Sequence, residues 1–542
     1  MDLCVERGGQ WVGLSWFTVS EVKKGQILER SISQKIIRNT IFNAIGRFWG
    51  ILVALGLTPY IIGHIGVERY GIWAIVGVLT GYFGLLDFGI GTSFVKYISE
   101  FYAKKDYERI NHIVNTGFVF YAIFAILITV LGFSLINPLL TFFKIPQSLY
   151  KEAIFVFLLG IILFGVSYAL SPFGAIQGGL QRMDISNKIA IVISIPSIAG
   201  TIFFLEKGYG LPGLMVNNAI ILVISSLLNI IVAFKILPEL KFNPFSISAE
   251  MFKKLFGYGY KLQVSRLANL ISFQTDKLLI SYFLGIGLVT FYQLGSSLLQ
   301  AVRQIPLILI SALVPAVSEI EARNGKNSLR EFYLRGSKYL ILVSTPLLFF
   351  VVTNATLIML TWMGKGYEKS ALVIQILAIG YFWTTVTGVA SSIASGVART
   401  DLDMKFGIFM AILNLFLSII LIIKMGFIGA VLGTTISLTV ASFFFMRMFH
   451  KYLGTPLSDF IRLFFKPVSA CIVSILIILL LNYSFWSLKV SSSRLVNLTI
   501  LLLNSVVFGG MYTTFVFLSK YLDEYDRNLV KNKIPLLKYL LR

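Results

Sequence analysis

The sequence is poor in residues that support metal or disulfide chemistry, with 2 cysteines and 3 histidines among 542 residues. Cys4 and Cys471 are far apart, so no structural disulfide is expected. The histidines stand singly near the ends of apolar segments, which favours surface positions over a metal site: His64, His112 and His450. A G-x-x-x-x-G-K-[ST] motif is also missing. We therefore predict no metal, no cofactor and no direct ATP hydrolysis.

Charge is equally scarce, since 13% of the residues are charged and 56% are hydrophobic. This balance lies outside the range of soluble proteins and predicts an all-α polytopic membrane protein. A crossing needs about 17 to 25 mostly apolar residues, which gives about 14 candidate spans. They cover residues 39–62, 70–98, 113–136, 153–178, 189–205, 211–236, 256–284, 288–318, 338–361, 369–397, 405–424, 427–449, 465–485 and 495–519. The first 30 residues do not have the pattern of a signal peptide.

Acidic residues are the scarcer charge, with 25 Asp and Glu against 47 Lys and Arg and a net charge of +22. The basic residues collect in alternate loops, among them 104–109, 235–254 and 323–338, and in the tail after residue 521. This distribution follows the positive-inside rule, so it indicates membrane topology and not a nucleic-acid partner. We expect a multi-pass protein of the cell (plasma or inner) membrane with both termini in the cytoplasm.

Two carboxylates interrupt the apolar spans. Asp87 lies within a long apolar run and would share one helix stripe with Thr80, Gly84 and Gly91. Asp276 would share a polar stripe in the seventh span with Ser265, Asn269 and Ser272. A charge at mid-membrane costs about 2.5 to 3.5 kcal/mol, so both must face a partner charge or a watery interior. Each could be an ion-coupling group or a counter-charge, and Asp87, whose span has no cation except Lys96 at its end, is the better candidate for coupling.

Four cations of the candidate spans are assigned to the presumed interior: Arg47, Arg266, Lys277 and Arg303. Arg47 could instead extend its head group to the cytoplasmic interface. Together the four outnumber the two carboxylates, and an excess of fixed cation in a low-dielectric cavity is stabilised by an anionic ligand. The four side chains are therefore predicted to line a translocation cavity that binds an anionic substrate.

A short pattern recurs in the two halves of the chain. Gly179, Arg182, Asp184 and Lys188 reappear with a constant offset as Gly396, Arg399, Asp401 and Lys405, in each case at the end of a span. We expect each arginine to form an ion pair with the aspartate two residues later. The pattern predicts an internal duplication into two six-helix lobes of the same membrane orientation, followed by two further helices. The expected boundaries are 1–34 for a cytoplasmic segment, 35–237 and 238–455 for the lobes, 456–520 for helices 13 and 14, and 521–542 for a basic cytoplasmic tail.

The runs YGIWAIVGVLTGYFGLLDFGIGTSFVKYISE, GAIQGGLQRMDISNK and QTDKLLISYFLG resemble the polysaccharide-transporter and O-antigen flippase branch of the multidrug/oligosaccharidyl-lipid/polysaccharide exporter superfamily. The resemblance covers about residues 35 to 520. It implies a V of two lobes that flips polyprenyl-pyrophosphate-linked glycans outward by alternating access. The implied partners are the lipid-linked glycan, membrane lipids and polysaccharide-assembly proteins.

Two alternatives stay open at this point. A multidrug/cation antiporter of the same superfamily would need an acidic cavity, which disagrees with the predominance of cations in the spans. A membrane glycosyltransferase or ligase would need catalytic groups on large extracytoplasmic loops, but the longest such loop predicted is about Asn137 to Lys151. The sequence therefore predicts a transporter and not an enzyme.

Overall fold

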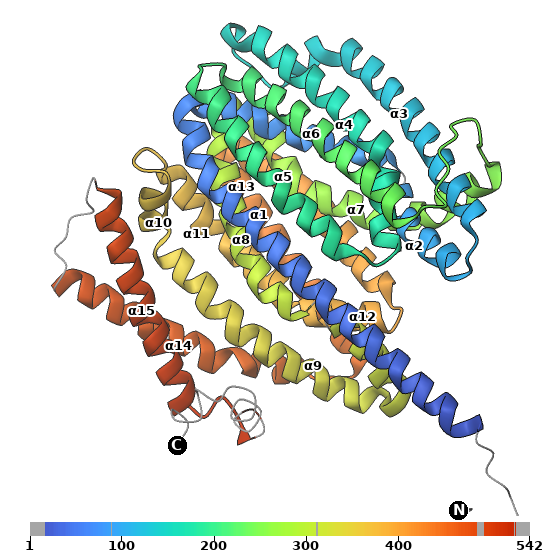
Figure 1. Ribbon diagram of the computed structural model, residues 1–542. Coiled ribbons are helices and arrows are strands. Elements are labelled where there is room, and N and C mark those ends of the chain that lie inside the picture. The colour runs from blue at the N-terminus through green and yellow to red at the C-terminus, as the bar shows by residue number, and fades with distance from the viewer. Residues whose placement is uncertain (1–16, 88, 311–312, 485–492, 525, 527–542) are drawn as a thin grey trace, which may run out of the picture.

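The computed structural model describes residues 17–87, 89–310, 313–484, 493–524 and 526, and these form helices with no β-strand among them. We call α1 to α6 the N-terminal half (Figure 1). Its elements are α1 (Phe17–Phe83), the 3₁₀ turn η1 (Gly84–Asp87), α2 (Ile90–Ala103), α3 (Tyr107–Phe142), η2 (Gln147–Leu149), α4 (Tyr150–Gly179), α5 (Met183–Glu206) and α6 (Gly210–Ile236).

We call α7 to α13 the C-terminal half. Its elements are α7 (Ala249–Leu284), α8 (Ile286–Ile310), α9 (Leu313–Thr353), α10 (Ala355–Trp362), α11 (Glu368–Val386), α12 (Gly388–Gly396) and α13 (Thr400–Leu453). Two further helices follow, α14 (Leu457–Ser484) and α15 (Arg494–Leu518). Both lie to one side of the bundle in Figure 1, where α14 packs against α9 and α15 contacts α10.

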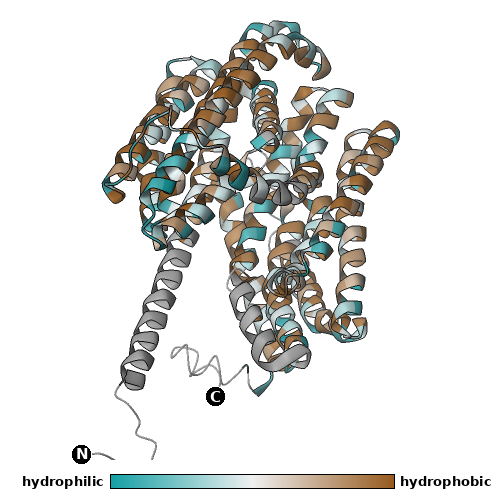
Figure 2. Ribbon diagram, turned by 90° about the vertical axis from the view of Figure 1, so that its right-hand side faces the viewer, coloured by the Kyte–Doolittle hydropathy of each residue, from teal (hydrophilic) through white to brown (hydrophobic). Residues whose placement is uncertain are grey.

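Within the described residues, ten helices are long and apolar enough to cross a membrane. Two of them contain a kink at a glycine with positive φ, Gly66 in α1 and Gly426 in α13. A straight helix of the 54 residues of α13 would be about 80 Å long, far more than a bilayer, so the kink is needed to divide it. Most helices are apolar along most of their length (Figure 2).

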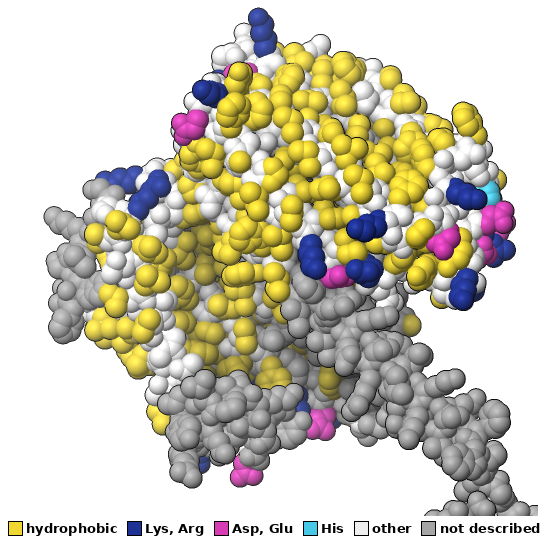
Figure 3. All heavy atoms as spheres, viewed as in Figure 1, with side chains coloured by type: hydrophobic (Ala, Val, Ile, Leu, Met, Phe, Trp, Pro, Cys, Tyr) yellow, Lys and Arg dark blue, Asp and Glu magenta, His cyan; other side chains and the backbone are white. Residues whose placement is uncertain are grey.

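The outward faces of α3 to α6 carry large exposed apolar side chains, including Ile126, Val130, Ile195 and Leu227. Figure 3 shows hydrophobic side chains spread over this side of the molecule, with Lys and Arg towards its edges. In a soluble protein so large an apolar surface would be an aggregation hazard, whereas in a bilayer it is the surface that contacts lipid.

The two halves meet along a seam between α1, α2 and α3 on one side and α7 and α8 on the other. At the end near the Gly66 kink, the hydroxyl of Thr290 donates to the backbone oxygen of Val67 at 2.6 Å, and that of Ser281 donates to Phe143 O at 2.8 Å. Gly71 lies directly against the carbonyl oxygen of Ile286, with which a Cβ would collide. Glycine at this position therefore lets the backbones of the two halves touch.

The two recurrent turns have the same local structure. Arg182 Nε lies 3.2 Å from Asp184 and Arg399 Nε lies 2.7 Å from Asp401, so the predicted ion pairs are confirmed. The residue before each arginine has positive φ, 56° at Gln181 and 57° at Ala398. The turns are locally equivalent, and the duplication of the whole lobes stays a prediction.

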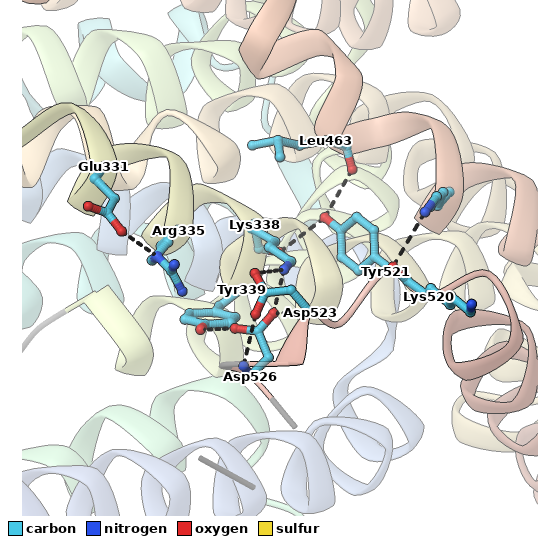
Figure 4. Close-up of polar contacts among 10 residues, drawn as sticks. Glu331, Arg335, Lys338, Tyr339, Leu463, Lys520, Tyr521, Asp523 and Asp526 are labelled. Carbon is cyan, nitrogen blue, oxygen red and sulfur yellow. Dashed lines mark hydrogen bonds and ion pairs between the residues drawn. The ribbon is translucent and has the colours of Figure 1, made fainter. Parts of the chain in front are cut away.

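A cluster of polar contacts fixes the segment after α15 to the C-terminal half (Figure 4). Buried Asp526 accepts hydrogen bonds from the ammonium of Lys338 and the hydroxyl of Tyr339, both on α9. Asp523 and Asp526 also accept each other's backbone N–H, at 2.9 and 3.1 Å. That backbone donor, together with Lys338, lowers the pKa of the Asp523 carboxyl. We call these four residues the C-terminal clamp.

Candidate functional site

Asp276 is the most fully enclosed acidic group of the C-terminal half, with no exposed surface. Its Oδ2 accepts hydrogen bonds from Tyr292 and Thr434, each at 2.5 Å, and its Oδ1 accepts one from Ser418 at 3.1 Å. Asn414 Nδ2 donates to Thr434 at 3.1 Å. Two helices, α8 and α13, thus bring four polar side chains together around the Asp276 carboxylate of α7.

The hydrogen-bond donors to the Asp276 carboxylate, among the described residues, are neutral hydroxyl groups. Among the described residues, no Lys or Arg forms an ion pair with it, and Asn414 Oδ1 is buried without a hydrogen-bond donor. Carboxylate, amide and hydroxyl oxygens are the ligands that small hard cations prefer, and a proton on the carboxylate would also remove the charge. The oxygen atoms of this cluster are therefore suited to binding a proton or a small cation.

Asp87 lies in a different setting, and the prediction of one continuous helix through residues 70–98 is wrong. The helix α1 ends at Phe83, η1 follows, and Gly89 has a φ of 74° before α2 begins. The Asp87 carboxylate accepts the backbone N–H of Gly91 at 3.1 Å and a hydrogen bond from Tyr121. The glycines at 84, 89 and 91 allow the break, and Asp87 satisfies the N–H groups that the break frees.

The structure places the four predicted cations in different surroundings. Arg47 is exposed on α1, and the side chain of Arg266 lies outside the described residues. Lys277 is buried, and Gln274 accepts its ammonium proton at 2.6 Å. Lys277 and Gln274 share a face of α7 with Leu270 and Ser281, which contact the N-terminal half at Gly81 and Phe143. Lys277 therefore lies on the seam.

Arg303 points into the C-terminal half. Its guanidinium lies over the rings of Phe273 and Tyr381, at 5.7 and 5.9 Å from the ring centres, and its Nε is buried without a partner. It lines a pocket of about 270 Å³ together with Asp403, whose carboxylate accepts a hydrogen bond from Ser391 at 2.7 Å. Lys277 is not among the residues that line this pocket, and a common cavity for Arg303 and Lys277 stays a prediction.

An apolar groove of about 790 Å³ runs beside the C-terminal half between α9, α11 and α14. Phe349, Phe382, Trp383 and Phe464 are among its lining residues. The groove contains two hydroxyl side chains, Thr353 and Ser469, and no charge. Such a surface suits a hydrocarbon chain.

The family model described as polysaccharide biosynthesis protein matches residues 36–321, which is more than half of the chain. The chain belongs to this family. A putative O-antigen transporter of Shigella flexneri is 22% identical over 410 residues, covering 74% of this chain and 94% of the relative. A probable low-salt glycan biosynthesis flippase, Agl15 of Haloferax volcanii, is 22% identical over 92% of this chain and 99% of its own length.

Solved structures share the fold at low sequence identity. The lipid II flippase MurJ, in an inward closed conformation, matches with a TM-score of 0.64 at 16% identity, covering 89% of this chain and all of MurJ. A multidrug resistance MATE family transporter, in an inward-facing conformation, matches with a TM-score of 0.63 at 15% identity, covering 77% of this chain and 94% of that one. The fold is therefore that of the MurJ and MATE transporters.

Proposed function

We propose that this protein is a flippase that moves polyprenyl-pyrophosphate-linked oligosaccharides from the cytoplasmic to the outer leaflet by alternating access, in the biosynthesis of a polysaccharide or glycan. The family and the named relatives support this function. The observation that carries it is the combination of a polar, cationic seam with a separate apolar groove, because a lipid-linked glycan has a polar, anionic head and a hydrocarbon tail.

The roles of the two parts follow from their chemistry. Lys277 would attract the pyrophosphate at the seam, with Arg47, Arg266 and Arg303 as further cations of the pathway. The groove between α9, α11 and α14 would hold the polyprenyl tail, which is consistent with the absence of charge from its lining.

The topology remains part of the proposal. If the kinked helices α1 and α13 each cross twice, and the more polar α7 and α8 each cross once, about 14 spans result, in two six-helix lobes (35–237 and 238–455) with α14 and α15 added. Both termini would then lie on the cytoplasmic side of the cell membrane. Polysaccharide-assembly proteins would be its partners.

For coupling, we propose that Asp276 and the oxygen atoms around it bind and release a proton or a small cation. A buried carboxylate held only by neutral donors is costly, and a bound cation or proton removes that cost. Asp87, the other candidate from the sequence, is engaged in capping α2.

The multidrug antiporter is the less favoured alternative, although the fold is shared. The seam carries Lys277, and a cation there would repel organic cations. A glycosyltransferase or ligase is disfavoured by the names of the relatives, which are transporters and flippases.

The proposal is tested with purified protein in liposomes that contain a fluorescent polyprenyl-pyrophosphate oligosaccharide. Accessibility of the sugar to an external lectin reports flipping. We expect flipping that depends on the protein. The flipping rate should be roughly tenfold lower for Lys277→Gln, whereas Lys277→Arg should keep most of the wild-type rate, because the positive charge attracts the pyrophosphate. Liposomes with wild-type protein that flip no faster than protein-free liposomes would refute the proposal.

A further inference from the structure

Another space with polar lining residues lies on the seam, between α1 and α8, and contains none of the residues discussed above. Its volume is about 340 Å³, within the range typical of small-ligand sites. Twelve residues line it: Ile51, Ala54, Leu55, Thr58, Tyr70, Gln293, Leu294, Ser297, Gln300, Ala301, Gln304 and Trp362. None of the twelve is charged. We call this space the amide pocket.

The polar residues of the amide pocket form one face of α8. Gln293, Ser297, Gln300 and Gln304 follow each other at steps of 4, 3 and 4, so they lie in a row along the helix. Thr58 and Tyr70 of α1 close the pocket from the N-terminal half. The pocket is therefore assembled only where the two halves meet.

Much of the hydrogen-bonding capacity in this row is unused. Gln293 Nε2 donates to Ser297 at 2.7 Å and Gln300 Nε2 reaches Tyr381 at 3.5 Å, so the side-chain carbonyl oxygens of both remain available as acceptors. Within the described residues, the half-buried amide of Gln304 has no hydrogen-bond partner at all. A ligand in the pocket would thus meet both donors and acceptors.

Aromatic surface completes the pocket. The indole of Trp362 is held in place because its Nε1 donates to the backbone oxygen of Leu55 at 2.7 Å. Tyr70 adds a second ring to the lining. Fixed aromatic groups provide apolar area at little entropic cost, and they suit the C–H faces of a sugar ring.

We propose that the amide pocket binds the uncharged part of the glycan, namely sugar hydroxyl or acetamido groups, and so contributes to selection of the substrate. Neutral amides can donate and accept at once, as hydroxyl and acetamido groups do. A phosphate or carboxylate would meet the amide oxygens without a proton to share and would find no cation among the lining residues.

This inference rests on the proposed flippase function and assigns two parts of the substrate to two separate binding surfaces. On this view the pyrophosphate binds the cations of the seam and the glycan binds a neutral row of amides. Tyr381 of α11 contacts both the neutral and the cationic side chains of α8. Gln300 Nε2 donates to its hydroxyl, and the Arg303 guanidinium lies over its ring. One helix thus presents a neutral and a cationic face.

The test uses the full chain in lipid nanodiscs and two probes, a polyprenyl pyrophosphate with an uncharged N-acetylhexosamine disaccharide and the same lipid without sugar. Each hydrogen bond between the side-chain amide of Gln304 and a neutral group contributes about 0.5 to 1.5 kcal/mol. Gln304→Leu should therefore weaken binding of the sugar-bearing lipid about two- to tenfold and leave the sugar-free lipid unaffected. Gln304→Asn keeps an amide on a shorter side chain, so its affinity for the sugar-bearing lipid should lie between those of the wild type and Gln304→Leu.

Asn218→Leu is the matched control, because Asn218 lines a pocket of the same volume, about 340 Å³, within the N-terminal half. It should bind both probes like the wild type. Equal loss for both probes in Gln304→Leu, or no loss for either, would overturn the sugar assignment while the wild type still flips its substrate. Failure of the wild type to flip any lipid-linked glycan would instead refute the proposed function.

Discussion

Two buried aspartates, Asp276 in the C-terminal half and Asp526 after α15, differ in one respect that separates their roles. Asp276 has no exposed surface and Asp526 is 2% exposed, and each accepts a hydrogen bond from a tyrosine. Asp526 also pairs with the ammonium of Lys338, whereas the other partners of Asp276 are hydroxyl groups. A compensated charge can hold two elements together permanently. An uncompensated one stays costly until a cation or proton arrives, which is the property that ion coupling needs.

The largest expected effect is on coupling at Asp276. Asp276→Asn keeps a similar shape but cannot be ionised, so flipping should lose its dependence on an imposed ion gradient, with a rate at least about tenfold below that of the wild type under the full gradient. The measurement is the lectin-accessibility assay in liposomes with and without a gradient. A variant that responds to the gradient as the wild type does would place the coupling group elsewhere.

A smaller effect is expected at Asp87. Asp87→Asn retains an oxygen that can accept from Gly91 and Tyr121, and the change from a charged to a neutral acceptor costs about 1 kcal/mol of stability. Thermal unfolding in detergent should show this loss, while flipping per folded molecule should remain gradient-dependent. Loss of that dependence would make the N-terminal carboxylate a coupling group as well, as the sequence suggested.

The smallest effect on transport is expected at the C-terminal clamp, where substitution should lower the free energy of unfolding and not the flipping rate. Lys338→Met leaves the Asp526 carboxylate buried without its cation, and breaking a buried pair in this way costs about 3 kcal/mol or more. The double variant Lys338→Met with Asp526→Asn should recover part of that loss, because no orphan charge remains. If the single variant flips at a much lower rate per folded molecule, the clamp is part of the transport cycle.

Part of this site was predictable from the sequence and part was not. Charge and hydropathy identified the membrane class, and the repeated glycine, arginine and aspartate predicted the ion pairs of Arg182 and Arg399. The hydroxyl groups around Asp276 were not predicted, because Ser418 and Thr434 come from a helix more than 140 residues later in the chain. Nothing local in the sequence connects them to α7.

Two other features were missed, one with a local cause and one with a tertiary cause. The helix break before α2 was signalled by three glycines near Asp87, but a helical-wheel analysis assumes an unbroken helix. On α8, Gln293 and Gln300 line the amide pocket and Arg303 does not. Packing against Phe273 and Tyr381 decides that Arg303 faces the C-terminal half, and tertiary packing is not visible in a single helix.

The contact between the halves near the Gly66 kink has a consequence for the environment in which the protein can work. Uncharged groups make most of that contact, at Gly71, Thr290 and Ser281, and one charged group joins them where the Lys144 ammonium donates to Phe283 O at 3.4 Å. Dissolved salt screens charged pairs but hardly affects neutral hydrogen bonds and close packing. In the proposed topology this end faces the cell exterior, so the uncharged contacts would keep the halves together over a wide range of external salinity, and the response to ions is left to a group enclosed deep inside the protein.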